Sequence, residues 1–380
     1  MTKSLVYTDD HDLFRKVVAE FVAKEITPFV NEWDEAETFP RDVYVKAGAL
    51  GLFGIGFNTE YGGMGDHDAL ALVILSEELA RCGAGGVPAS LFSNYIGAPP
   101  IQRGGSDEVK AEILPAMLAG ESICALAITE PSGGSDVANI LTTAVRDGDH
   151  FVVNGSKTFI TSGMRADYVT AAVRTGGPGA GGVSLLVIPT DLDGFSRTQL
   201  DKMGWWASDT ATLYFDECRV PARYLLGEEN AGFRLVMENF NNERLFMTAG
   251  MTMAARVCFE EALAWARERK TFGARLADHQ VIRHKLVDMD RRINATRAWL
   301  EQLAWRVDQG ETPAAELAEC KVQASLTMEF CAREAAQILG GASYLRGNPV
   351  ERIYREVRVN AIGGGSEEVM RDLAARQLGI

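Results

Sequence analysis

The sequence predicts an α+β protein of several domains: an N-terminal helical domain, a central antiparallel β domain and a C-terminal helix-bundle domain. Three observations predict this order. With 380 residues, of which 47% are hydrophobic, the chain exceeds what one core usually organises. Its hydrophobic spacing is helical near both ends. Between them lie short β-rich runs separated by turn residues.

Residues 1–120 are expected to form the helical domain. Apolar residues recur at helical spacing in two stretches, near the start (Phe14, Val17, Val18, Phe21, Val22) and later (Leu70, Leu72, Val73, Leu75, Leu79). Helix breaks are expected at Pro28, at Pro40, at 61–63 and at Pro99-Pro100.

Residues 121–227 are expected to form the β domain. Its β-rich runs are 123–129, 151–153, 168–173, 183–188 and 211–215. Turn clusters such as 147–149, 154–155 and 176–179 separate the runs, as is usual between antiparallel strands. Long helical periods return over residues 228–380, which suits a helix bundle whose packed faces extend into oligomer contacts.

Composition argues against several classes of partner. The net charge of −14 and the pI near 5.0 do not suit nucleic acid, which needs clustered Lys and Arg. The first ten residues do not resemble a secretory or transit signal, and no apolar run reaches the roughly 18–20 residues of a membrane span. We therefore expect a cytoplasmic protein. The spacing of six Cys and five His predicts no metal site.

One acidic residue stands on an apolar helix face. Positions advance by alternating steps of three and four in a set consisting of Val236, Phe240, Glu243, Met247, Met251, Ala254 and Cys258. A carboxylate in such surroundings loses hydration, which raises its pKa and makes it a candidate proton acceptor. Two other interpretations of Glu243 stay open on this pattern alone: an ion pair with Arg244 or with another cation at the edge of this face, or a cap on a helix beginning at Asn241-Asn242.

The run from Ala127 to Asp136, Ala-Ile-Thr-Glu-Pro-Ser-Gly-Gly-Ser-Asp, resembles the flavin-site signature of the acyl-CoA dehydrogenase family. The resemblance implies that FAD is bound by Leu126, Ile128, Thr129, Gly134 and Ser135, with backbone N–H groups near the pyrophosphate. Asn139 departs from the pattern, which has a small residue at that position. A second run, 154–161, resembles the other flavin segment and adds Phe159, Ile160 and Thr161. Phe159 stands where the family usually has Trp, and it can still cover the flavin ring.

The resemblance continues toward the C-terminus through 268–273, 279–280 and 337–341. In this family these segments hold the FAD of a neighbouring subunit. The residues expected to do so are Arg269, Thr271, Phe272, Gln280, Gln337, Ile338, Gly340 and Gly341. Together with 60–63 near the front, the match covers nearly the whole chain and implies the family fold, with a four-helix bundle as its C-terminal domain.

The catalytic base is expected to be Glu243. Many members carry the base near the C-terminus, but the corresponding position here is Gly363. The long-chain and isovaleryl branches place it instead in a Glu-Arg-Leu context on the first long helix of the last domain, which Glu243-Arg244-Leu245 matches. Glu367 and Glu368 are weaker candidates. The resemblance also implies cofactor contacts at Gly365, Ser366 and Glu367, and substrate contacts at Ser135, Asn241, Arg244, Gly363 and Gly364.

The implied function is FAD-dependent α,β-dehydrogenation of a long- or branched-chain acyl-CoA to the trans-2-enoyl-CoA. The implied partners are an electron-transfer flavoprotein as acceptor and identical subunits in a homotetramer, or dimer of dimers. Two rival interpretations remain open: an oxidase that passes electrons to oxygen, and a scaffold paralogue that binds FAD or acyl-CoA without catalysis. Gly363 motivates the scaffold interpretation and Glu243 argues against it.

Overall fold

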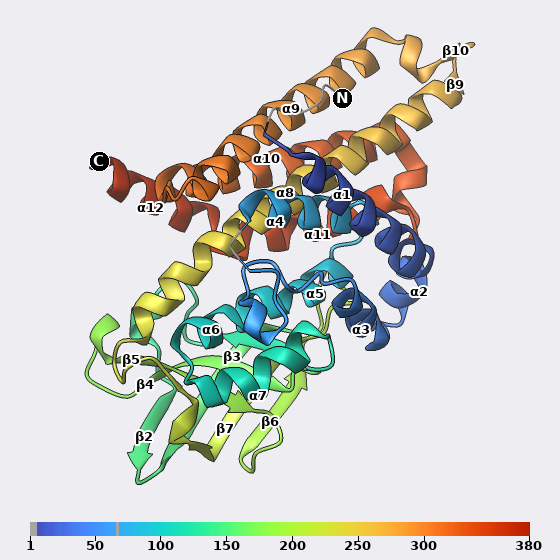
Figure 1. The fold of residues 1–380 in the computed structure, drawn as a ribbon. Coiled ribbons are helices and arrows are strands. Elements are labelled where there is room, and N and C mark those ends of the chain that lie inside the picture. Colours follow the sequence, from blue (N-terminus) through green and yellow to red (C-terminus); the bar gives the residue numbers. More distant parts are fainter. Residues whose placement is uncertain (1–5, 66–67) are drawn as a thin grey trace.

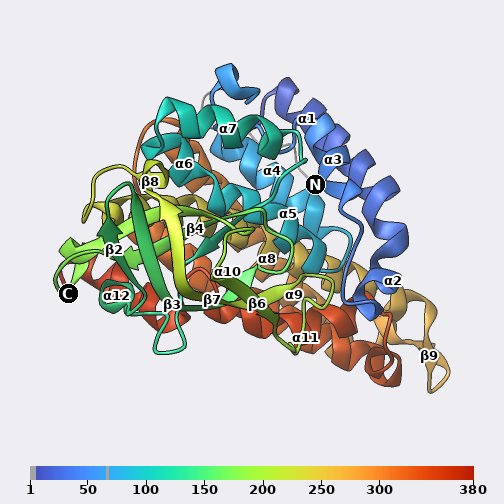
Figure 2. The same cartoon turned by 90° about the horizontal axis from the view of Figure 1, so that it is seen from below.

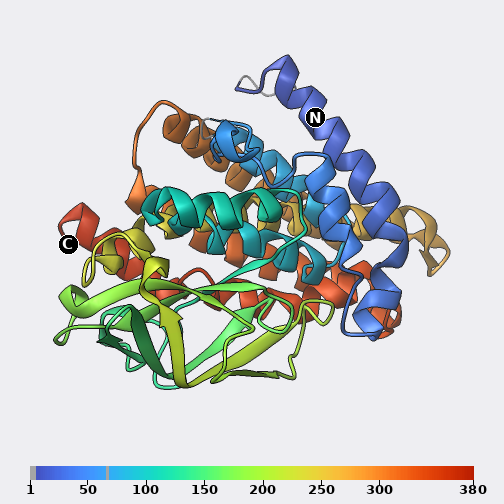
Figure 3. The same ribbon diagram turned by 60° about the horizontal axis from the view of Figure 1, so that its bottom comes forward.

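A computed structural model describes residues 6–65 and 68–380, apart from the side chain of Asn241. The strands of the large sheet form one layer at one end of the molecule, and helices form the rest apart from the small hairpin at 270–275 at the other end (Figure 1). Figure 3 shows the strands as a separate layer beneath the helices, and Figure 2 shows the sheet from below. The N-terminal helices are α1 (Asp9–Phe21), α2 (Val30–Glu35), α3 (Asp42–Ala49), α4 (Ala69–Ala80), α5 (Gly86–Gly97), α6 (Pro99–Gly104) and α7 (Asp107–Leu118).

The helix α4 lies at the centre of the helical layers. Every residue from Ala69 to Leu79 is buried, because α1, α8 and α9 pack around this helix. Its first turn is capped by Asp68, whose side chain accepts a hydrogen bond from the N–H of Ala71 at 2.7 Å. The expected break at Pro99-Pro100 is confirmed, because α5 ends at Gly97 and α6 begins at Pro99. Both prolines lie in the first turn of α6, where the missing N–H groups have no helical acceptor to lose.

The sheet contains strands β1 (Cys124–Ala127), β2 (Thr143–Asp147), β3 (His150–Thr161), β4 (Tyr168–Arg174), β5 (Val183–Pro189), β6 (Phe195–Gln199), β7 (Thr210–Pro221) and β8 (Leu225–Leu226). The order is β6-β7-β3-β2-β4-β5-β8, and β1 pairs with β4. Most pairs are antiparallel, as predicted, but β1 runs parallel to β4 and β2 meets β4 in parallel at Thr143. The sheet is therefore mixed, because β4 has parallel contacts beside its antiparallel partner β5.

The C-terminal region consists of α8 (Gly232–Glu268), a hairpin of β9 (Lys270–Thr271) and β10 (Ala274–Arg275), and then α9 (Gln280–Asp308), α10 (Ala314–Leu339), α11 (Pro349–Ile362) and α12 (Glu367–Leu378). At 37 residues, α8 is long enough to run from the sheet to the hairpin at the opposite end of the molecule (Figure 1). It packs against α10, α4, α9 and α11. This one helix therefore contacts both helical regions.

One apolar core crosses the limits proposed for the first two domains. Buried residues from Val18 through the sheet to Leu226 form a single cluster, which also contains Val236 and Phe246 of α8. A second cluster lies between α8, α9, α10 and α11. The division into 1–120, 121–227 and 228–380 stays a proposal based on the change of element type. All six cysteines are buried and unpaired. Within 6–65 and 68–380, no helix is both long and apolar enough to cross a membrane, and no cluster of three or more acidic, His or Cys side chains suits a metal.

Candidate active site

The two predicted flavin segments lie side by side at the edge of β1 and β3. The N–H of Thr158 donates to the carbonyl of Thr129 at 2.9 Å. The loop that follows Thr129 leaves Gly133, Gly134 and Ser135 exposed. A Cβ placed on Gly133 would meet nothing within 4 Å, so the backbone there is open to a ligand. Ile128 and Ile160 are buried, so only their backbones can reach a cofactor.

Phe159 is an exposed aromatic residue in a strained backbone conformation. It lies on β3 with φ near 60° and has 69% of its surface exposed. Left-handed backbone at a bulky residue costs free energy and often marks a functional site. An exposed ring beside an open glycine loop fits the planar ring and the pyrophosphate of FAD, which this pair of segments is expected to bind.

A buried ion pair that was not predicted from the sequence supports these segments from behind. The ammonium of Lys157 lies 2.8 Å from a carboxylate oxygen of Glu130 and donates to the carbonyl of Ile128 at 3.0 Å. Glu130 also accepts hydrogen bonds from the N–H groups of Leu141 and Thr142 at 2.6 and 2.9 Å. These bonds fix both ends of the 130–142 loop.

Glu243 lies on α8 as predicted, with its side chain partly buried. Loss of hydration raises the pKa of its carboxyl to about 7, against the opposing attraction of Arg244 and Lys321. The alternative in which Glu243 caps a helix is wrong, because α8 begins at Gly232. The other alternative, an ion pair between Glu243 and Arg244, stays open, because the charge of Arg244 attracts the carboxylate of Glu243. A carboxyl with this pKa can accept a proton near neutral pH.

A glycine turn between α11 and α12 approaches Glu243. A Cβ added to Gly364, where φ is 64°, would lie 3.7 Å from a carboxylate oxygen of Glu243 and 2.6 Å from the sulfur of Met247. At Gly363 an added Cβ would meet the Val359 carbonyl at 3.2 Å. The missing side chain at Gly364 therefore leaves room for Met247 of α8, and the carboxylate of Glu243 lies at van der Waals distance from the turn.

Two predicted contacts in this turn are already engaged. The N–H of Gly363, expected near the thioester, donates to the carbonyl of Val359 at 2.7 Å as the last bond of α11. Binding a thioester there would require that bond to open or be shared. Glu367 accepts a hydrogen bond from the hydroxyl of Ser325 at 2.6 Å and pairs with Arg371. Its side chain is turned toward α10, and its flavin contact stays a prediction.

Helix α5 joins the region of the base to the sheet. On α8, the amide of Asn239 donates to the carbonyl of Ile96 at 2.8 Å. Next to it, the carbonyl of Gly97 accepts a hydrogen bond from Thr170 of β4 at 2.6 Å. The side chain of Asn94 accepts one from the N–H of Cys124 on β1. These three contacts couple the position of α8 to the strands that carry the flavin segments.

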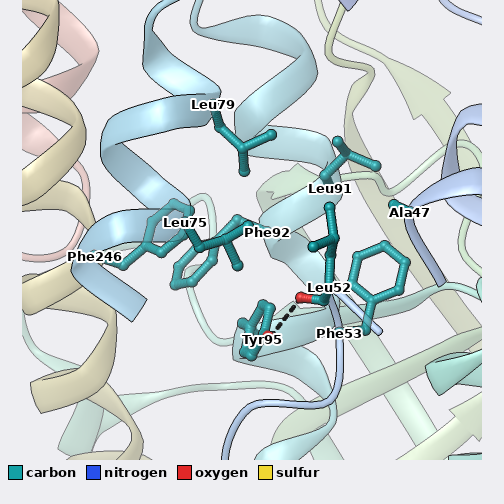
Figure 4. A pocket seen from close by; sticks show the side chains of 9 residues that line it. All are labelled: Ala47, Leu52, Phe53, Leu75, Leu79, Leu91, Phe92, Tyr95 and Phe246. Atoms are coloured by element: carbon teal, nitrogen blue, oxygen red, sulfur yellow. Dashed lines mark hydrogen bonds between the residues drawn. The ribbon is translucent and has the colours of Figure 1, made fainter. Parts of the chain in front are cut away.

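An apolar cavity lies beside α8, one turn beyond Glu243. Its lining comes from α3, α4, α5, α8 and the segment after α3, and Figure 4 shows the nine side chains. Phe92 and Phe246 stack there with ring centroids 3.4 Å apart, and the hydroxyl of Tyr95 donates to the carbonyl of Leu52 at 2.6 Å. The cavity, about 10 Å³, has room for about one water molecule.

The predicted cofactor residues fall into three groups, one of which is the turn at 365–367. The residues of 126–161 lie on the sheet, whereas Arg269, Thr271 and Phe272 lie on the β9–β10 hairpin at the other end of α8 (Figure 1). Gln280 begins α9, and 337–341 end α10. Phe272 is fully exposed, while Ile338 is buried in the core of the C-terminal helices. The sheet and the β9–β10 hairpin lie at opposite ends of the molecule (Figure 1), as expected if the hairpin contacts the FAD of a neighbouring subunit.

Two further residues lie on the helices around Glu243, Asn241 on α8 and Lys321 on α10. Asn241 lies on α8, but its side chain is outside the described residues. Lys321 on α10 is a buried cation close enough to Glu243 to lower its pKa, and it is not among the residues that the sequence predicts for the site. The signal was available, because Lys321 is a lone charge on the apolar positions Leu317, Ala324 and Met328 of a helical period.

Comparisons with known proteins cover the whole fold. Models of the acyl-CoA dehydrogenase N-terminal, middle and C-terminal domains match residues 8–121, 125–218 and 230–379. The long-chain specific acyl-CoA dehydrogenase of Rattus norvegicus mitochondria is 36% identical over 98% of this chain and 87% of its own length. The short-chain specific acyl-CoA dehydrogenase of Clostridium acetobutylicum is 35% identical over 96% of each chain.

The same likeness appears in three dimensions. A crystal structure of a probable acyl-CoA dehydrogenase from Mycobacterium abscessus has a TM-score of 0.95 and 44% identity, covering 98% of this chain and 99% of that one. The open glycine loop and the exposed Phe159 fit the cofactor that this family uses. The chain therefore belongs to the acyl-CoA dehydrogenase family, whose members are FAD-dependent oxidoreductases.

Proposed function

We propose that this chain converts an acyl-CoA to its trans-2-enoyl-CoA with Glu243 as the base. The observation that carries the proposal is the partly buried carboxyl with a pKa of about 7 beside the glycine turn at 363–365. Bound FAD would accept the hydride that leaves the β carbon. Glu243 would take the α proton, and its desolvated carboxylate is a stronger base than one in water.

We further propose a long- or branched-chain acyl group, with the branched class favoured. The placement of the base on α8 suits both classes. The apolar cavity against Phe246, one turn along α8 from Glu243, favours the more compact class, because a branched acyl group would require a smaller opening of the stack of Phe92 on Phe246 than a long straight chain would. The same apolar walls would exclude water from the reacting carbons, which keeps the carboxylate desolvated.

We propose an electron-transfer flavoprotein as the acceptor and a homotetramer as the assembly, both by resemblance to the family. The separation between the sheet and the β9–β10 hairpin supports an assembly in which Arg269 and Phe272 reach the FAD of a neighbouring subunit. In such an assembly each complete site requires two chains.

The test is anaerobic mixing of the FAD-loaded protein with butyryl-, isovaleryl- and palmitoyl-CoA, with flavin absorbance as the readout. We expect isovaleryl-CoA to bleach the wild-type flavin and Glu243→Gln to retain the oxidised spectrum with FAD still bound. Bleaching that survives in Glu243→Gln would move the base elsewhere, with Glu367 the next candidate. No bleaching by any thioester would favour the scaffold, and fast reoxidation in air would favour the oxidase.

A further inference from the structure

Lys321 is a buried cation on the inner face of α10. Its side chain is fully buried, and it shares its face of the helix with Leu317, Ala324 and Met328. Removing an ammonium from water costs free energy unless other groups stabilise the charge. A methionine or leucine would fill the same space without that cost, so packing alone gives no reason for a lysine.

The ammonium is bonded to the glycine turn. It donates a hydrogen bond to the carbonyl of Gly365 at 2.7 Å, across 44 positions of sequence. Gly364 and Gly365 have φ of 64° and 99° and no side chains that could hold the turn in place. Lys321 therefore supplies the anchor between α10 and the segment that faces Glu243.

The charged groups around Lys321 come from two other helices. Glu243 and Arg244 act on it from α8, and Glu367 and Glu368 act from α12. Glu367 already receives a hydrogen bond from Ser325 and an ion pair from Arg371. Glu243, in contrast, lies at van der Waals distance from the glycine turn, so the charge of Lys321 also acts on the carboxylate that is proposed as the base.

We propose that Lys321 is a positioning residue for the dehydrogenation, which anchors the 363–365 turn beside Glu243 and holds that carboxylate in its proton-accepting form. The inference rests on the proposed function, since it requires Glu243 to be the base. Lys321 does not touch the reacting atoms; it acts through the turn and through its charge.

The expected effect on acidity has a definite sign. Desolvation raises the pKa of Glu243 to about 7, and Arg244 and Lys321 oppose that rise. Burial lowers the pKa of Lys321 to about 8, while Glu367 and Glu243 favour its charged form, so the ammonium is largely charged at pH 7. Removing its charge therefore raises the pKa of Glu243 further.

The experiment follows anaerobic flavin reduction by an excess of the acyl-CoA that reduces the wild type, from pH 5.5 to 9, in three variants. Lys321→Met removes donor and charge, Lys321→Gln keeps a neutral donor, and Lys321→Arg keeps both. The control is Lys46→Met, which makes the same change in net charge at an exposed ion pair with Glu25 and Asp42. FAD content and melting temperature are recorded for each protein.

We expect the acid limb of the rate profile to move up by about one pH unit in Lys321→Gln and Lys321→Met. The rate of Lys321→Gln would then be roughly fivefold below wild type at pH 7 and close to it at pH 9. Lys321→Met should in addition require more acyl-CoA for half-maximal rate, because the turn loses its anchor. Lys321→Arg should restore the limb, and Lys46→Met should not move it.

If the acid limb of Lys321→Gln coincides with that of the wild type, or if the rate of this variant falls by the same factor at every pH, the role of Lys321 is overturned. The proposed function would be unaffected. If Lys321→Met does not fold, the acid limbs of Lys321→Gln and Lys321→Arg still test the role of the charge. A wild type that no acyl-CoA reduces, or a Glu243→Gln variant that is still reduced, would overturn the proposed function and this inference together.

Discussion

The ammonium of Lys157 and the carboxylate of Glu130 are 2.8 Å apart, and both side chains are almost fully buried behind the loop that is expected to hold FAD. The pair ties β3 to the segment after β1. Breaking such a pair by removing one partner leaves an uncompensated charge, which costs about 3–5 kcal/mol.

Lys157→Met is therefore expected to lower the thermal stability of the protein and to reduce the FAD retained after gel filtration. The double variant Glu130→Gln/Lys157→Met should recover part of the stability, since no charge is left unpaired. Melting temperature and flavin content per chain are the measurements. Equal losses in the single and double variants would contradict the role of the pair.

Glu243 is expected to make the fold less stable as pH rises. Its pKa is raised from 4.5 to about 7 in the folded chain, so the folded state holds the proton more tightly than the unfolded state does. Its contribution to stability is therefore largest below pH 4.5 and is lost as pH rises through 7. Glu243→Gln carries no such titration.

The melting temperature of Glu243→Gln should match wild type near pH 5 and exceed it by about 2–4 °C at pH 8.5. The control is Glu238→Gln on the same helix, where the carboxylate is 46% exposed and pairs with Arg234. That variant should show the same difference from wild type at both pH values. A gap for Glu243→Gln that shrinks with rising pH would be the opposite of this prediction.

Phe92→Ala is expected to shift the substrate preference toward longer acyl chains, because it removes one ring of the stack that closes the apolar cavity. A buried Phe→Ala change also costs about 3–5 kcal/mol of stability. Phe21→Ala, at a buried position of the same core away from the cavity lining, supplies a control with a similar loss. The measurement is the ratio of flavin-reduction rates with palmitoyl- and isovaleryl-CoA, which should rise in Phe92→Ala and stay constant in Phe21→Ala.

Mixed oligomers should reveal whether the distal hairpin acts on a neighbouring subunit. Subunits with Glu243→Gln lack the base, and subunits with Arg269→Ala lack the distal contact. If Arg269 acts across the interface, random pairing of the two gives wild-type composition at about a quarter of the sites. Co-expression should then restore about a quarter of the wild-type activity.

The matched control is Gly134→Asp in place of Arg269→Ala. Gly134 lies in the loop after β1, in the flavin segment that is expected to bind the FAD of its own chain, so pairing this variant with Glu243→Gln leaves every site defective. Activity in the control mixture equal to that in the Arg269→Ala mixture would argue against contact across subunits.

The placement of Glu243 on a partly buried helix face could be predicted, because a helix repeats every few residues and therefore shows its buried face in the sequence. The same rule could have found Lys321. Strands β2 and β6 escaped prediction because their residues are mostly exposed and are held by pairing with β3 and β7. Nor could local pattern show that Gly364 approaches Glu243, since that contact joins residues more than a hundred positions apart.

The single core that passes from the N-terminal helices through the sheet to Val236 and Phe246 limits how this protein can be recombined. A chimera of two relatives joined at 120/121 or at 227/228 would combine core side chains from different proteins, and these side chains would not be complementary in shape. Each such junction would expose or distort apolar contacts rather than cut a linker. The unit that can be exchanged between relatives is therefore the whole chain, even though the sequence divides by element type into three.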